Sequence, residues 1–240
     1  MTKRMRGRIT YLSKKPERLD AIRGREDFLL TEQADGVIVL HSHSEIDDAP
    51  SVLRDVMIAY NGKTGKPLQC SVRLTVGGTF EGCGFMYFTD QEANCQTFHH
   101  RDGVLTQKIA LSKPIAWLVA HQIIGDGLLT ILYQGEEPGK QPCTPIMLTS
   151  PDHRGATGPM LFPLQFSLRL VGKETIKVGA GTFESLHFRL EDTGAGGLPE
   201  EHPPYDMWVT NDRYRMYLKG GVGGYMQTYY ELTELNTEES

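Results

Sequence analysis

The stretch Leu164–Leu190 reads LQFSLRLVGKETIKVGAGTFESLHFRL, and it decides the predicted fold. Apolar and polar residues alternate along both of its arms, and a period of two is typical of β-strands with one buried face. The glycines between the arms supply the backbone freedom that a tight turn needs. The stretch therefore predicts a β-hairpin.

Two further runs continue this pattern toward the C-terminus. Asp206–Gly221 reads DMWVTNDRYRMYLKGG, and Tyr225–Leu235 reads YMQTYYELTEL. Consecutive alternating strands joined by turns are typical of antiparallel sheets. We therefore expect a mainly β protein, built as an antiparallel curved sheet or a half-open barrel of lipocalin or lipoprotein-carrier shape.

Alternation sorts the side chains of these strands into two faces. One face is an aliphatic core. The other gathers polar and aromatic residues, namely His187, Arg189, Arg215, Tyr217, Tyr225 and Tyr229. This second face has two interpretations, the solvated side of a sheet or the wall of a ligand cavity.

The rest of the chain suggests two β subdomains that form one continuous structural unit. Residues 1–135 form the N-terminal subdomain, with one substantial α-helix expected at 114–124 between a first-turn proline and a closing glycine. Residues 136–163 are rich in Pro and Gly and predict a crossing loop, and residues 164–240 form the C-terminal subdomain. A second irregular stretch, Asp192–Tyr205, is expected to border a cavity.

Composition excludes several classes of function. The formal net charge of −5 argues against a nucleic-acid partner, because phosphate binding needs a basic surface. The chain has no apolar run of signal-peptide or membrane-span length, so we expect a cytoplasmic protein without a membrane span. Its four cysteines lack C-x-x-C spacing, and none of the common nucleotide-binding or hydrolase motifs is present. We therefore expect no cofactor.

The C-terminal third resembles a known family. VGKETIKVGAGTFESLHF, the following DMWVTND and the closing YYELTEL are similar to the pattern of the DUF3108-like proteins, a family of curved β-sheets or incomplete β-barrels. The resemblance implies an open antiparallel barrel whose concave side can hold an apolar molecule. It implies no catalytic residue.

His187 is the histidine that we select for chemistry. It lies two residues from Arg189 on the polar and aromatic face, where an imidazole can transfer a proton and a guanidinium can stabilise an oxyanion. Tyr229 is the candidate phenolic acid. The expected substrate-binding residues are Trp208, Tyr217, Tyr225, Arg215 and His99.

A metal site is an alternative interpretation. His41 and His43 stand two apart on one expected strand and are followed by Asp47, which resembles the first half of a cupin motif. The second half of that motif is absent. A polar strand end that enters a turn also explains this run, and we favour that explanation.

These observations lead to three hypotheses about function. The first is binding of a small apolar or aromatic metabolite in a concave β cavity, with cofactor-independent acid–base turnover of lyase, isomerase or hydratase type. The second is a non-catalytic carrier or binding protein for a hydrophobic ligand. The third is a metal-dependent, cupin-like enzyme. All three leave room for a homodimer.

Overall fold

A computed structural model describes residues 3–195, 198 and 200–239. In this part of the chain fifteen strands form one sheet with the order β8-β7-β6-β5-β4-β3-β2-β1-β15-β14-β13-β12-β11-β10-β9. Their bounds are β1 (Lys3–Ser13), β2 (Ile22–Glu32), β3 (Val37–Ile46), β4 (Val52–Asn61), β5 (Pro67–Val76), β6 (Thr79–Phe88), β7 (Glu92–His99), β8 (Gly103–Ala110), β9 (Trp117–Val119), β10 (Gly139–Leu148), β11 (Phe162–Val178), β12 (Gly181–Glu191), β13 (Tyr205–Thr210), β14 (Tyr217–Val222) and β15 (Thr228–Glu239).

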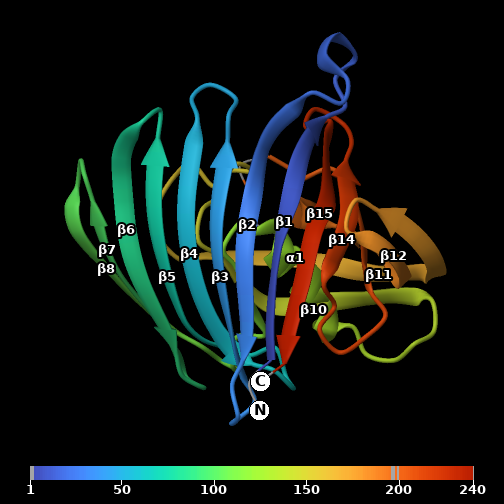
Figure 1. Cartoon of the computed structure of the whole chain (residues 1–240). Coiled ribbons are helices and arrows are strands. Elements are labelled where there is room, and N and C mark those ends of the chain that lie inside the picture. The colour runs from blue at the N-terminus through green and yellow to red at the C-terminus, as the bar shows by residue number, and fades with distance from the viewer. Residues whose placement is uncertain (1–2, 196–197, 199, 240) are drawn as a thin grey trace.

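The path of the chain begins and ends in the middle of the sheet. It runs outward strand by strand from β1 to the edge at β8, crosses to the opposite edge, and returns from β10 to β15. There β15 pairs with β1 in antiparallel register from Lys3↔Glu239 to Ser13↔Thr228, so the two ends of the chain lie side by side (Figure 1). All strand pairs are antiparallel except β9 with β10. The expected curved antiparallel sheet is confirmed.

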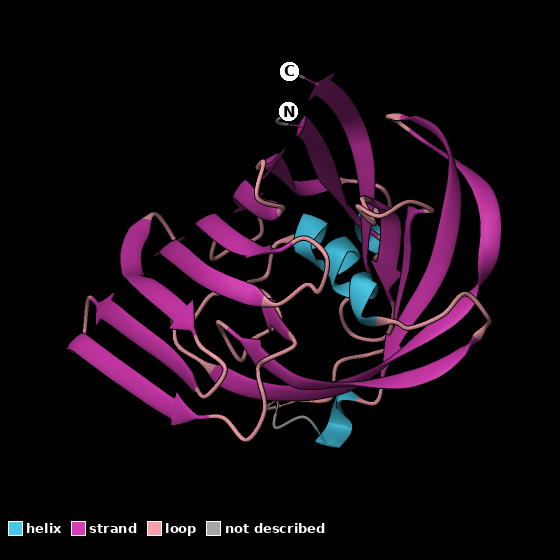
Figure 2. Ribbon diagram, turned by 90° about the horizontal axis from the view of Figure 1, so that it is seen from below, coloured by secondary structure: helices cyan, strands magenta, loops and turns pink. Residues whose placement is uncertain are grey.

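The sheet curls around a core that lies on its inner side. Alternate residues of β3 and β4 are buried, and these residues face the core. Seen from below, the strands enclose the short helices of the crossing segment (Figure 2). The outer side faces solvent and carries most of the charged residues of the strands.

The helix expected at residues 114–124 is in the wrong place. Residues Trp117–Val119 form β9, which pairs in parallel with Ile146–Leu148 of β10. The apolar run belongs to a short strand buried on both faces, a pattern that resembles a buried helix in sequence. The helix α1 spans Ile123–Leu129 and continues as a 3₁₀ turn over Thr130–Leu132. No helix in the described part of the chain is long and apolar enough to cross a membrane.

The crossing loop expected at residues 136–163 is shorter than predicted, because ten of its residues form β10. The prolines of this segment favoured the prediction of a loop, because proline is rare inside strands. Pro145 sits where the register with β11 shifts between Cys143 and Ile146, a position at which a ladder tolerates a missing N–H. Two further 3₁₀ turns cover Pro16–Arg18 and Thr193–Ala195.

Candidate functional site

The candidate site is a cavity of about 340 Å³ on the inner side of the sheet. Its walls come from inward residues of both halves of the sheet, from α1 and from two loops. Much of the wall is aliphatic or aromatic and includes Val119, Leu129, Leu148, Leu164, Phe166 and Val222. The irregular stretch 192–205 borders it through Thr193, Leu198, Glu200, His202 and Tyr205, as expected, although residues 196, 197 and 199 of that stretch lie outside the described part.

Tyr11, Tyr205 and Tyr230 form one end of the cavity, and Tyr217 lies behind them in the core. The rings of Tyr11 and Tyr230 meet edge to face with their centroids 5.1 Å apart, and Tyr205 packs against Tyr230 at 6.2 Å. The Tyr205 hydroxyl donates a hydrogen bond of 2.8 Å to the hydroxyl of Tyr217. Burial raises the pKa of each of these four phenols, so they are neutral at physiological pH. This end presents flat apolar rings with neutral hydroxyl groups.

A buried carboxylate joins this end to the helix. Glu26 of β2 is 0% exposed and accepts hydrogen bonds from the backbone N–H groups of Ile123 and Ile124, at 2.8 and 3.0 Å. It also accepts bonds from the hydroxyls of Ser44 and Tyr11, at 2.9 and 3.0 Å. Burial raises the pKa of Glu26, although these hydrogen bonds act in the opposite direction. Glu26 therefore caps α1 and fixes it to the sheet.

A second carboxyl group faces the cavity itself. Asp126 projects from α1, lies deep in the protein, and keeps part of its surface on the cavity wall. Burial, and then the charge of Glu26, raise the pKa of Asp126 well above its ordinary value of 3.8. A carboxyl group forms hydrogen bonds in either protonation state, so Asp126 can orient a ligand.

Another part of the cavity wall is basic. Arg54 of β4 is only 3% exposed, and its burial lowers the pKa of the guanidinium to about 10, so it stays protonated at neutral pH. His121 lies beside it and bonds through Nε2 to the carbonyl oxygen of Ser150 at 2.9 Å. Burial and the charge of Arg54 lower the pKa of His121 to about 4. His121 is therefore a neutral imidazole whose Nε2 donates, as expected for a structurally bonded histidine.

Two of the residues selected for catalysis, His187 and Arg189, meet on the outer face of the sheet. His187 and Arg189 of β12 both reach Asp206 of β13, with His187 Nε2 at 2.7 Å and the Arg189 guanidinium bonding bidentately at 2.9 and 3.1 Å. The ring of His187 stacks on Trp208 with the centroids 4.0 Å apart. Tyr229 of β15 lies on the same face, three strands away from β12, beneath the ammonium group of Lys14. The alternation of β12 paired these residues correctly, but none of them lines the cavity.

Three residues of the predicted substrate-binding set, Tyr217, Arg215 and His99, lie elsewhere. Tyr217 was expected beside His187, and this is wrong. The register shifts between Trp208 and Val209, so Tyr217 pairs with Val209 and turns into the core. Arg215 lies in the turn that precedes β14, with a positive φ of 49°. Tyr225, by contrast, lines the cavity and meets His153 edge to face at 5.7 Å.

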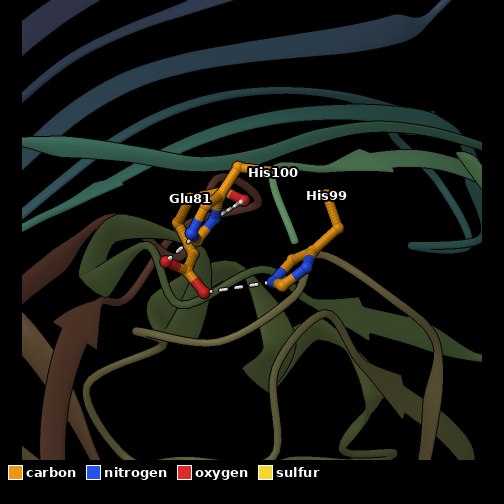
Figure 3. A group of neighbouring side chains, drawn as sticks. All are labelled: Glu81, His99 and His100. Carbon is orange, nitrogen blue, oxygen red and sulfur yellow. Dashed lines mark hydrogen bonds and ion pairs between the residues drawn. The ribbon is translucent and has the colours of Figure 1, made fainter. Parts of the chain in front are cut away.

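His99 belongs to a separate cluster at the ends of β6 and β7 (Figure 3). Glu81, His99 and His100 are the one group of three or more in the described part of the chain whose His, Cys, Asp or Glu ligand atoms all lie within 4.8 Å of one another. His99 Nε2 lies 3.0 Å from Glu81 Oε1, and its Nδ1 lies 2.8 Å from Asp102 Oδ2.

An ion is not needed to explain this cluster. His100 Nδ1 lies 3.1 Å from the backbone oxygen of Glu81, and Arg101 donates to His100 Nε2 at 3.3 Å. A cation would have to displace the first bond and would lie beside a guanidinium. We interpret the cluster as a set of polar contacts that join neighbouring strands.

The alternative metal residues do not meet in the described structure. His41 and His43 lie on the outer face of β3, in an open trough of about 1390 Å³. His43 is held between Asp55 at 2.6 Å and Glu45 at 3.1 Å, and the hydrogen bond to Asp55 raises its pKa. Asp47 follows the end of β3 and joins neither histidine in a ligand group. The explanation as a polar strand end fits this geometry.

Sequence reasoning missed Arg54 and Glu26, although alternation carries the signal for both. Arg54 is in phase with Val52 and Val56 on the inward face of its strand, and Glu26 is in phase with Phe28. A charged residue in phase with apolar neighbours is either paired or functional, because burying a bare charge is costly. Asp126 has no such signal, because its place depends on where α1 begins.

Comparisons with known proteins support the fold and leave the function open. No protein-family model matches the chain, and no curated protein matches it. Among solved structures, the chain is similar to a β-barrel-like protein of domain of unknown function DUF1849 from Brucella abortus, with a TM-score of 0.55 over 99% of this chain and 98% of that one. The two share 8% sequence identity, so the similarity shows the fold alone. A curved, β-barrel-like sheet is thus supported, whereas the resemblance to the DUF3108 family finds no support.

Proposed function

We propose that this protein binds a small, largely apolar molecule in the cavity between the curved sheet and α1. The observation that carries the proposal is the cavity itself. Its volume of about 340 Å³ is in the range of small-molecule sites, and its wall combines apolar side chains with a few polar groups. Tyr205, Tyr230 and Asp126 offer polar groups that can orient a ligand, and Arg54 adds a buried cation to the wall.

The geometry supports ligand binding more directly than catalytic turnover. Acid–base turnover by His187, Arg189 and Tyr229 stays a prediction, and it would require a substrate on the outer face of the sheet. There Asp206 already engages both His187 and Arg189. A non-catalytic carrier or binding protein needs only the cavity, which is why we place this hypothesis first.

A cavity-filling variant tests the proposal. Leu190 is half-buried at the end of β12 and lines the cavity, so Leu190→Trp places an indole in the space that a ligand would occupy. We expect wild-type protein to bind a neutral apolar fluorescent probe at one saturable site. We expect Leu190→Trp to weaken that binding by roughly tenfold or more, because the lost volume removes apolar contacts. Fluorescence titration measures both.

Val171→Trp is the matched control, because Val171 is exposed on β11 outside the cavity. It adds the same side chain and is expected to leave probe affinity unchanged. Equal binding by wild type and Leu190→Trp, with both proteins folded by circular dichroism, would place the probe elsewhere and contradict the proposal.

A further inference from the structure

Arg54 is a buried cation without an ion pair among the described residues. Its Nη2 donates to the backbone oxygen of Arg154 at 3.1 Å, and its Nη1 to that of His121 at 3.5 Å. A guanidinium has five N–H donors, and these bonds use two of them. Carbonyl oxygens offer only partial charges, so the full positive charge is left uncompensated at contact distance.

The carboxylates nearest to Arg54 are committed to other partners. Asp152 accepts hydrogen bonds from the hydroxyls of Ser150 and Thr157 and from the backbone N–H of Arg154, each at 2.9 Å. Although burial raises the pKa of Asp152, its hydrogen bonds bring that pKa below the ordinary value, so it is a stable carboxylate in its own turn. Glu26 is occupied by α1, as described above. Neither group makes an ion pair with Arg54 in the described structure.

A second buried donor lies in the same wall. Nε of Arg154 is buried and has no hydrogen-bond partner among the described residues, while its Nη2 donates to the backbone oxygens of Asp48 and Pro50, at 2.7 and 2.6 Å. Buried polar groups are nearly always satisfied, so an orphaned N–H next to an uncompensated guanidinium indicates a missing acceptor. Both arginines line the cavity.

From these contacts we propose that the ligand of the cavity is an amphiphilic carboxylic acid whose carboxylate binds Arg54. The planar guanidinium can donate two parallel hydrogen bonds to a carboxylate. The apolar part of the ligand then lies along the aliphatic and tyrosine wall. Burial raises the pKa of Asp126, which disfavours a second anion on the same wall. This inference rests on the proposed function, since it names the chemical class that the same cavity accepts.

Paired probes of equal shape and different charge test the inference on the full chain. Decanoic acid is compared with decan-1-ol, and naphthoic acid with the corresponding naphthylmethanol, by isothermal titration calorimetry at pH 7. We expect the acid of at least one pair to bind about tenfold to a hundredfold more tightly than its alcohol, as charge-assisted hydrogen bonds in a desolvated site provide.

Variants of Arg54 then locate the charge. Arg54→Met retains the aliphatic stem and is expected to remove the preference for the acid while leaving alcohol affinity within about twofold. Arg54→Lys keeps the charge and is expected to retain part of the preference. Arg73→Met, on the solvent-exposed face of β5, is the matched control and should not alter either affinity. Thermal melts confirm that each variant is folded.

The outcomes separate the carboxylate assignment from the proposed apolar site. Acids and alcohols that bind equally to wild type would overturn the carboxylate assignment and leave the apolar site intact. An equal loss of both affinities in Arg54→Met would show that Arg54 only shapes the loop around Arg154. If Arg54→Met does not fold, the wild-type pairs and Arg54→Lys still decide. Failure of all four probes to bind would count against the proposed function and this inference together.

Discussion

At the scale of single residues, Asp126 shows how burial changes the proton affinity of a carboxyl group. Its carboxyl group forms no ion pair among the described residues, and Glu26 adds a like charge nearby. Both effects disfavour the ionised form, and they outweigh a hydrogen bond with Tyr205 that acts in the opposite direction, so the folded protein binds the Asp126 proton more tightly than the unfolded chain does. This difference in proton affinity makes the free energy of unfolding depend on pH.

The pH dependence of stability tests this reading of Asp126. Because the pKa of its carboxyl is raised on folding, the folded state binds more protons than the unfolded state between the two pKa values. The stability that this proton confers is fully present below about pH 4 and is lost as the pH rises toward the folded pKa, at up to about 1.4 kcal/mol per pH unit. We expect Asp126→Asn to gain stability relative to wild type as the pH increases from 4 to 8, measured by urea unfolding. A difference that stays constant over this range would mean that Asp126 titrates normally.

At the scale of elements, α1 depends on the sheet for its first turn. Its N-cap residue, Gln122, makes no capping bond with its side chain, and Glu26 accepts the free N–H groups instead. A helix of seven residues is too short to be stable alone, so this tertiary cap and the packing of its apolar side decide its place.

Adjacent acids on β2 test the role of the cap. Glu26→Gln turns two acceptor oxygens into one and places an amide among groups that donate, so we expect a loss of about 3 kcal/mol or more in the free energy of unfolding. Asp27→Asn is the control, since Asp27 pairs with Arg8 on the outer face and an exposed pair contributes about 1 kcal/mol or less. Urea denaturation compares them, and equal losses would refute the assigned role of Glu26.

The elements also show how far sequence reasoning reaches. Strand alternation predicted β11, β12 and β15 and the common face of His187 and Arg189, because these depend on local period alone. It failed at Tyr217, where a register shift turns the side chain inward, and at residues 114–124, where burial on both sides removes the period. The cavity could not be predicted, since its walls come from strands that are distant in sequence and from a helix capped by β2.

At the scale of the whole molecule, the chain ends lie together in the centre of the sheet. Lys3 is the register partner of Glu239, whereas Gly77 and Gly78 form an exposed turn between β5 and β6. We therefore expect a circular permutant that joins the ends by a short linker and opens between these glycines to fold and to retain the apolar probe site. A permutant opened between Val56 and Met57, inside β4, is expected to unfold at a much lower temperature. Thermal melts compare the two, and equal melting temperatures would contradict the central role of strand continuity.

The pairing of β1 with β15 also sets an order of events during synthesis. While the chain is being made, β1 offers an unpaired row of backbone N–H and C=O groups until the last strand emerges to cover it. A chain that lacks residues 228–239 would leave β1 unpaired on one side, and this exposed strand edge could pair with another copy. We therefore expect β15, which contributes Tyr230 to the cavity wall, also to protect the nascent protein from aggregation.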